Sequence, residues 1–130
     1  MIAVDTNVIL RLVLDDDDAQ VAAARALMLR APLFVSLSVL LETGWVLQSR
    51  YRFPRAEVAD ALQLVVNLNG VIVARLPIVL WAIGRYREGA DLADMIHLAS
   101  AAKIGAFATF DRGIEAKSGT GAPIEIETLT

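Results

Sequence analysis

The sequence predicts an α/β fold, in the form of a three-layer α/β/α sandwich with a central, mainly parallel sheet. Short apolar runs typical of buried strands alternate along the chain with longer segments that have the periodicity of amphipathic helices. Strands that alternate with helices in this way form parallel sheets covered by helices. The 130 residues contain no linker and no internal repeat, so we expect one domain over residues 1–130.

The first 74 residues are predicted to hold three strands and four helices. The acidic run at residues 15–18 breaks the first helical pattern, and we interpret it as a solvated turn with an N-cap, because carboxylates favour helix N-termini. The Asn69–Gly70 pair is a typical helix stop. In order, the expected elements are a strand at 2–5, helices at 6–14 and 19–30, a strand at 33–36, a helix capped by Ser36 or Ser38, a helix at 54–68 and a strand at 71–74.

The rest of the chain is predicted to add two helices and two strands. A helix is expected from Pro77 to about residue 88, because proline suits the first turn of a helix. Asp91 is expected to cap the next helix, which continues through residue 103 and is terminated by Gly105. The last two strands are expected at 106–110 and 124–126.

Composition narrows the class of protein. The absence of cysteine excludes disulfides, thiolate zinc sites and cysteine nucleophiles, and it fits a reducing, cytoplasmic location. No basic leader and no apolar run of membrane-spanning length are present, so we expect neither a signal peptide nor a membrane span. Hydrophobic residues make up 56% of the chain, more than one core of this size needs, so part of this surface is expected to form a subunit or partner interface.

Four acidic residues stand where strands meet helices: Asp5, Glu42, Asp94 and Asp111. In a parallel sheet, ligands bind beyond the carboxyl ends of the strands. Asp5 and Asp111 end the first and fourth predicted strands, and Glu42 and Asp94 lie near the starts of neighbouring helices. We therefore expect all four carboxylates to reach one pocket. Carboxylates ~4 Å apart repel by about 4 kcal/mol per pair at an effective dielectric constant near 20, which favours a bound cation.

Oxygen ligands select Mg²⁺ or Mn²⁺ over zinc. Such an ion supports attack of one of its waters on a phosphodiester and stabilises the developing charge, without a covalent nucleophile. The net charge of −3 argues against a nucleic-acid partner, but it becomes +1 when the four candidate acids are set aside. The residues therefore predict metal-dependent phosphodiester hydrolysis.

Four segments resemble motifs of the PIN-domain ribonucleases, and within them the VapC-like toxins of toxin–antitoxin pairs. The opening Ile2-Ala3-Val4-Asp5-Thr6-Asn7 is similar to the family's first motif, and the segment from Ser36 to Glu42 is similar to its second. Residues 90–99, which contain Asp94, resemble the third motif. Thr109-Phe110-Asp111 resembles the fourth, with Thr109 as its accompanying hydroxyl. The matches follow the family's order over residues 2–112.

This resemblance implies a PIN fold, dependence on Mg²⁺ or Mn²⁺, and endonucleolytic cleavage of structured RNA. It also implies homodimerisation and inhibition by a small antitoxin protein. By the same resemblance, Asp5, Glu42 and Asp94 bind the metal, and Asp111 is a fourth acid of more variable role. We further expect an apolar partner face around the helices at residues 19–30 and 57–68, with a basic side chain of the antitoxin inserted between the carboxylates.

Several polar residues near these motifs have two interpretations. Thr6 and Asn7 either cap the first helix or hydrogen-bond to water on the metal. Asp91 is favoured as a helix N-cap over a member of the site. The single histidine, His97, is expected to pack within its helix rather than to act at the site.

The segment Arg50-Tyr51-Arg52-Phe53-Pro54-Arg55 interleaves basic and aromatic residues, as RNA-binding surfaces do. The favoured alternative is a helix C-terminus with arginines that complement its dipole and with buried rings. The other candidate phosphate contacts are Arg11, Arg85, Arg87 and Arg112. Arg11, two turns after Asp5, is also a candidate contact for an acidic partner.

Three other functions share part of this pattern. A phosphotransfer or dehalogenase-like phosphatase domain also has an aspartate after its first strand, but the latter needs a second aspartate where this chain has Asn7. A catalytically idle PIN-like module that binds RNA or protein is expected to lose site acids, which this chain keeps. A DNA-cleaving flap-nuclease relative usually has extra acids and a longer clamp region.

Overall fold

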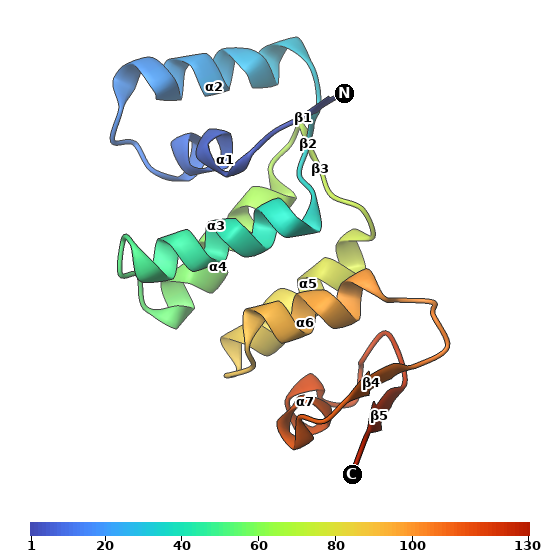
Figure 1. Ribbon diagram of the computed structural model, residues 1–130. Coiled ribbons are helices and arrows are strands. Elements are labelled where there is room, and N and C mark those ends of the chain that lie inside the picture. The colour runs from blue at the N-terminus through green and yellow to red at the C-terminus, as the bar shows by residue number, and fades with distance from the viewer. The chain divides into compact units, whose positions relative to one another are not determined.

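The computed structural model describes residues 1–130 and divides into two compact units, Met1–Ala74 and Arg75–Thr130. Unit 1 contains strands β1 to β3 and helices α1 to α4, and unit 2 contains β4, β5 and α5 to α7 (Figure 1). The expected helix-rich α/β class with parallel strand pairing is confirmed, although the strands form one parallel sheet in each unit.

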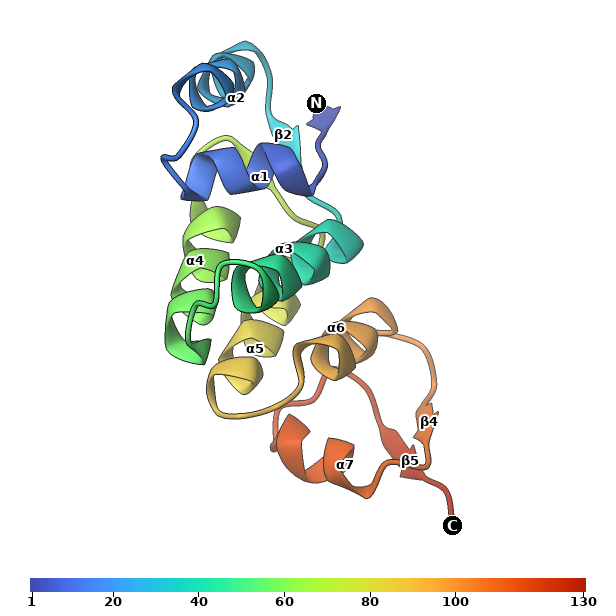
Figure 2. The ribbon, with the colours of Figure 1, turned by 60° about the vertical axis from the view of Figure 1, so that its left-hand side comes forward.

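Unit 1 is organised around a three-stranded parallel sheet in the order β1-β2-β3. Ile2 is paired with Leu33, and Leu33 with Val71. Helix α1 lies between α2 and the pair α3 and α4 (Figure 2). The bounds are β1 Ile2–Ala3, α1 Thr6–Val13, α2 Asp18–Arg30, β2 Leu33–Phe34, α3 Leu37–Ser49, α4 Arg55–Asn67 and β3 Val71–Ile72.

The core of unit 1 positions the ends of β1 and α3. Side chains from α1, β2, α3 and α4 are fully or almost fully buried, among them Ile9, Leu10, Leu33, Leu40, Leu47 and Leu62. Burying a leucine or isoleucine stabilises a fold by about 1.5–3 kcal/mol relative to its exposed state. The residues that follow β1 and those on the outer side of α3 are therefore held on a rigid support.

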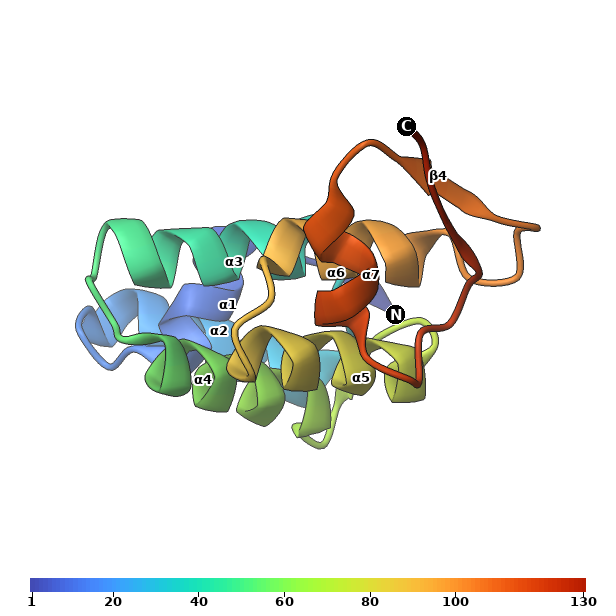
Figure 3. The same cartoon turned by 90° about the horizontal axis from the view of Figure 1, so that it is seen from below.

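Unit 2 pairs two helices and adds a small sheet. Helices α5 and α6 pack side by side (Figure 3), and β4 and β5 form a parallel pair in which Phe107 is opposite Ile126. The buried side chains of this unit include Val79, Ile83, Met95, Leu98 and Ile114. The bounds are α5 Leu76–Arg87, α6 Leu92–Ser100, β4 Phe107–Thr109, α7 Arg112–Ser118 and β5 Ile126–Thr128.

Two predicted boundaries in unit 2 are wrong. Helix α6 ends at Ser100 rather than at Lys103, because the chain tightens into turns and Lys103 adopts a left-handed conformation with φ of 74°. The last strand begins at Ile126 rather than at residue 124. The hydrogen bonds of Phe107 N–H to the Glu125 carbonyl and of Leu129 N–H to the Thr109 carbonyl fix this register. No helix is both long and apolar enough to cross a membrane.

Candidate metal site

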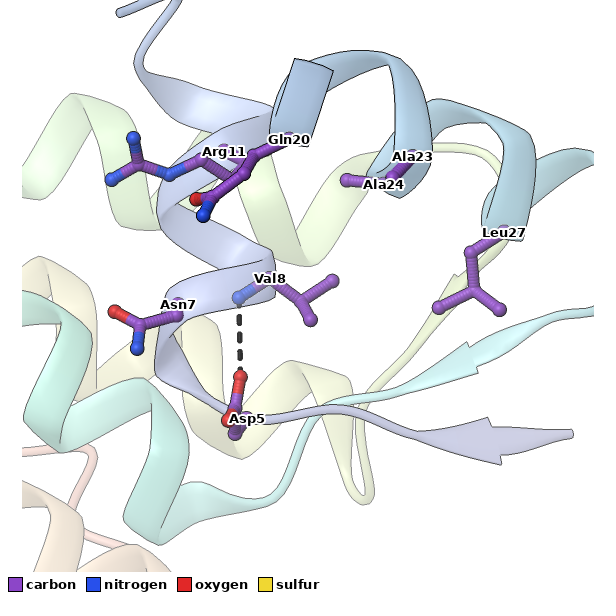
Figure 4. A pocket seen from close by; sticks show the side chains of 8 residues that line it. All are labelled: Asp5, Asn7, Val8, Arg11, Gln20, Ala23, Ala24 and Leu27. Carbon is purple, nitrogen blue, oxygen red and sulfur yellow. Dashed lines mark hydrogen bonds between the residues drawn. The ribbon is translucent and has the colours of Figure 1, made fainter. Parts of the chain in front are cut away.

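Asp5 lies at the junction between β1 and α1. It is the N-cap of α1, where its carboxylate accepts a hydrogen bond of 3.2 Å from Val8 N–H (Figure 4). An aspartate at this position suits the partial positive charge of the helix N-terminus. The cap uses one carboxylate oxygen, Oδ1, and the side chain is exposed.

Glu42 is carried by α3, beyond the cap of that helix. Ser36 is the N-cap, accepting a hydrogen bond from Val39 N–H at 3.2 Å, so the first of the two predicted capping serines fills the role. Glu42 and Asp5 line the same cavity, of about 250 Å³. The full lining is Asp5, Thr6, Asn7, Leu10, Glu42, Trp45, Val46 and Arg50. Two of the four predicted acids are therefore brought together within unit 1.

Thr6 lines this cavity and has a buried hydroxyl that is unsatisfied. The residue is 6% exposed, and its Oγ1 has no hydrogen-bond partner. A buried polar atom without a partner is costly in a protein unless water or a ligand satisfies it. The two carboxylates and the side-chain carbonyl of Asn7 in the lining are oxygen donors, the type of ligand that a hydrated Mg²⁺ or Mn²⁺ ion takes.

In unit 2, two of the predicted acids cap helices. Asp91 accepts a hydrogen bond from Asp94 N–H at 2.9 Å and caps α6, which is the favoured of its two interpretations. Asp111 accepts one from Gly113 N–H at 2.8 Å and caps α7. Thr109 supports this turn, because its Oγ1 accepts a hydrogen bond of 3.0 Å from Asp111 N–H.

Among the predicted acids of unit 2, Asp94 caps no helix. Its pKa is raised, first by partial burial and then by repulsion from the carboxylates of Asp91 and Asp111. The neighbouring His97 acts in the opposite direction and lowers this pKa. His97 is exposed, so the expectation that it packs within its helix is wrong; its neighbours Ile96 and Leu98 fill the buried side of α6 instead.

Within neither unit do three or more acidic or histidine side chains lie close enough together to hold a metal ion. Mg²⁺ is often bound through one or two carboxylates, with water and substrate phosphates as its other ligands. The pair Asp5 and Glu42 meets that lower requirement.

The candidate arginines differ in whether they already form ion pairs or hydrogen bonds within the protein. Arg11 is 13% exposed on its side chain, pairs with Asp16 and donates to the Tyr51 hydroxyl at 3.4 Å. Arg50 lines the cavity and forms no ion pair. Arg52 and Arg112 are exposed, Arg52 with a positive φ of 58° and Arg112 at the start of α7.

The aromatic residues of the basic segment at 50–55 and one aspartate of the acidic run at 15–18 have structural roles. Tyr51 and Phe53 pack edge to face with ring centroids 6.5 Å apart, and both are half-buried, whereas the favoured alternative expected buried rings. In the acidic run, Asp17 caps α2 by accepting from Gln20 N–H at 3.0 Å. This confirms the turn and N-cap interpretation of residues 15–18.

Trp45 is the cavity residue that sequence reasoning missed. It stands in an apolar helical stretch, yet it is 62% exposed. The available signal was its spacing, because Trp45 follows Glu42 by three residues and such pairs share one side of a helix.

A second cavity, of about 420 Å³, lies between α1 and α2 (Figure 4). Its walls are mostly apolar, with Val8, Ala24 and Leu27 among them, and Asp5 stands at one edge. Asp5 therefore lines both this cavity and the one that contains Glu42.

Comparison with known protein families gives one match. The family model described as PIN domain matches residues 2–119, a span that enters both units and includes all four candidate acids. Searches of curated proteins and of solved structures returned no match.

Proposed function

Since this chain belongs to the PIN domain family, we propose that it is an endoribonuclease dependent on Mg²⁺ or Mn²⁺. PIN domains are generally metal-dependent nucleases, and a role in binding RNA is typical of the family. The observation that carries the proposal is the cavity lined by Asp5 and Glu42 together with Thr6, whose buried hydroxyl has no partner.

The proposed metal ligands are Asp5, Glu42, Asp94 and Asp111. The inclusion of Asp94 and Asp111 rests on the order of the family's motifs in the sequence, and so does our proposal that residues 1–130 act as one domain. The pKa of Asp94 is raised first by burial and then by repulsion from Asp91 and Asp111, and a cation relieves the repulsive part, which supports its role.

The residues that line the cavity are proposed to have different roles in hydrolysis. When bound, a divalent cation makes a coordinated water more acidic and stabilises charge on the phosphate. Asp5 and Glu42 hold the ion, and Asp5 is oriented by its hydrogen bond to the start of α1. The Thr6 hydroxyl and the Asn7 amide orient water in the cavity. Arg50 supplies positive charge for a phosphate of the substrate.

A cleavage assay on structured RNA tests this function. Purified protein is incubated with total RNA and with a DNA of matched sequence, in Mg²⁺, in Mn²⁺ and in EDTA. We expect internal cleavage of RNA in either metal and none in EDTA. Cleavage of DNA alone contradicts the choice of substrate, and intact RNA in both metals contradicts the proposed activity, as an idle binding module would.

We further propose that the protein is the toxin of a toxin–antitoxin pair in the cytoplasm and that it forms a homodimer. The apolar cavity between α1 and α2 suits a segment of an antitoxin. Because Asp5 also lines the metal cavity, a basic side chain of that segment can pair with Asp5 and compete with the ion. The exposed Leu29 on α2 and Leu64 on α4 extend the apolar surface available to partners.

Growth and mass measurements test these roles. Expression of the wild type is expected to slow growth, and co-expression of the open reading frame immediately upstream is expected to restore it. Light scattering is expected to give twice the monomer mass of 14.0 kDa at micromolar concentration. A monomeric mass contradicts the dimer, and unimpaired growth contradicts the toxin role.

A further inference from the structure

We propose that Trp45 is a stacking platform for an unpaired nucleobase of the RNA substrate, next to the phosphate that is cleaved. This inference rests on the proposed function and names a subsite of the same cavity. It predicts that the enzyme cleaves at loops, bulges or single-stranded segments, where a base is free to leave its neighbours and stack on a side chain.

The first observation is the exposure of an indole beside the carboxylates. Trp45 is 62% exposed and lines the cavity that contains Asp5 and Glu42. Tryptophan carries a large apolar surface that is normally buried at least in part, so an exposed one indicates a binding surface. It lies on α3, a helix anchored by the fully buried Leu40 and Leu47, so the platform has a rigid support.

The second observation is the charge around the indole. Arg50 lines the same cavity and forms no ion pair with Asp5 or Glu42. An unpaired guanidinium and an exposed aromatic ring in one cavity are complementary to a nucleotide, whose phosphate is an anion and whose base has two flat faces. The other aromatic rings near this end of α3, those of Tyr51 and Phe53, pack against each other and leave Trp45 as the free ring.

The third observation concerns the kind of occupant. The cavity is small, at about 250 Å³, and its lining combines two carboxylates with one guanidinium. A single stacked nucleotide has a neutral base for the indole and only one phosphate for the metal and Arg50. Duplex RNA keeps its bases stacked inside the helix and cannot use the platform.

Tryptophan fluorescence gives a direct test. The chain has two tryptophans, and the variant Trp81→Phe leaves Trp45 as the single reporter. A mixed-sequence single-stranded oligoribonucleotide is added in Ca²⁺ in place of Mg²⁺, with a gel that verifies that the RNA stays intact, and the same sequence is added as a duplex. We expect the single strand to quench Trp45 strongly at saturation and the duplex to leave its emission nearly unchanged. Equal quenching by both contradicts the proposal.

Substitutions of Trp45 give a second measurement that does not depend on the Trp81 variant. Trp45→Leu is expected to weaken binding of the single strand by about 5- to 150-fold, the range for loss of one stacked base, whereas Trp45→Tyr keeps most of the affinity. Ile72→Ala changes another exposed apolar residue of unit 1 that does not line the cavity, so it is the matched control and is expected to bind as the wild type does.

The outcomes separate this inference from the proposed function. If wild type cleaves RNA with metal but Trp45→Leu binds and cleaves with unchanged Kd and KM, the stacking platform is wrong and the nuclease proposal stands. If wild type cleaves no RNA, the nuclease proposal is wrong, and with it this subsite. If Trp45→Leu converts a dimer to a monomer with unchanged RNA affinity, Trp45 belongs to a subunit interface and the platform is contradicted.

Discussion

The two units use their acidic residues in parallel ways. Each places one aspartate directly after a strand as the N-cap of the next helix, Asp5 in unit 1 and Asp111 in unit 2. Each also carries one candidate site acid that caps no helix, Glu42 in unit 1 and Asp94 in unit 2. Capping explains the presence of the first pair through stability alone. The second pair is not explained by capping. Asp94 lies in the first turn of α6, where a carboxylate suits the helix N-terminus, so Glu42 is the stronger indication of function.

The units differ in what surrounds the acid that caps nothing. Glu42 shares its cavity with the guanidinium of Arg50. Asp94 instead stands near Asp91 and Asp111, and the nearby titratable group that lowers its pKa is the exposed His97. Unit 1 thus supplies some positive charge in the cavity of Glu42, whereas no arginine or lysine is among the groups that shift the pKa of Asp94. The electrostatic argument for a bound cation is stronger in unit 2, and the geometric argument is stronger in unit 1.

The largest expected effect is loss of cleavage when either of these acids is neutralised. Glu42→Gln and Asp94→Asn keep the shape of the side chain but remove a metal ligand, and Asp5→Asn does the same while keeping a good capping residue. Losing several kcal/mol of transition-state stabilisation corresponds to a fall in kcat/KM of about 10²–10⁴-fold. The rate of RNA cleavage in Mg²⁺ measures it.

Asp15→Asn is the matched control, because it removes an exposed carboxylate from the acidic run between α1 and α2. It is expected to cleave as the wild type does. If Glu42→Gln is inactive while Asp94→Asn is fully active, unit 1 holds the metal without the acid of unit 2, and the four-acid proposal is contradicted.

Stabilisation by metal is the next largest effect and compares the units directly. An ion that binds the folded state alone stabilises it by about 2.7 kcal/mol at a hundredfold excess over its Kd. Mg²⁺ and Mn²⁺ are therefore expected to raise the Tm of wild type, as measured by calorimetry over a concentration series. The rise is expected to shrink in Glu42→Gln and in Asp94→Asn alike.

A different pattern separates the units. If Asp94→Asn keeps the full metal-dependent rise in Tm and Glu42→Gln loses it, the ion is bound by unit 1 alone. If no divalent ion up to millimolar concentration shifts the Tm of wild type, the metal proposal fails for both units.

Local sequence rules predicted the scaffold well and the surroundings of the site less well. Acidic residues and serine before helices identified the caps at Asp17, Ser36 and Asp91, because capping depends on a few neighbouring residues. The end of α6 was missed, because Ala101 and Ala102 are good helix formers that the structure nevertheless places in turns.

The surroundings of the acids depend on contacts between elements, which a local pattern does not contain. Trp45 looks like a core residue within an apolar stretch, and only the packing of α3 shows that it faces outward. Arg11 looks like a free cation, but Asp16 and Tyr51 engage it. Residue type and spacing thus identified the candidate ligands, whereas exposure and pairing required the structure.

Helix capping gives a smaller effect and separates the structural role of Asp91 from a role in the site. Asp91→Ala removes the acceptor for Asp94 N–H and is expected to lower the free energy of unfolding by about 0.5–2 kcal/mol. Asp91→Asn keeps the cap and removes the charge, so it is expected to be nearly as stable and as active as wild type. Urea denaturation and the cleavage assay measure the two properties.

Asp17→Ala is the counterpart in unit 1, since Asp17 caps α2 in the same way and lies in the acidic run outside the proposed site. It is expected to show a similar loss of stability with unchanged cleavage. Loss of cleavage in Asp91→Asn would show that the charge of Asp91 serves the site, against its assignment as a cap alone.

The smallest expected effect is the pH dependence that Asp94 contributes to stability in EDTA. An aspartate ordinarily has a pKa of about 3.9, and in the folded chain the pKa of Asp94 is higher. The folded state therefore holds this proton more tightly than the unfolded state, so stability falls as pH rises from the ordinary pKa through the raised one.

The replacement Asp94→Asn cannot ionise. It is expected to be more stable than wild type at neutral pH, by less than about 1 kcal/mol because the group is partly exposed and screened. This advantage is expected to vanish near pH 3, where Asp94 is protonated in both states, and the difference in Tm between the two proteins across this pH range measures it. An advantage that persists undiminished at pH 3 would mean that repulsion around Asp94 is not its source, and the electrostatic contrast between the two units would then lose its basis.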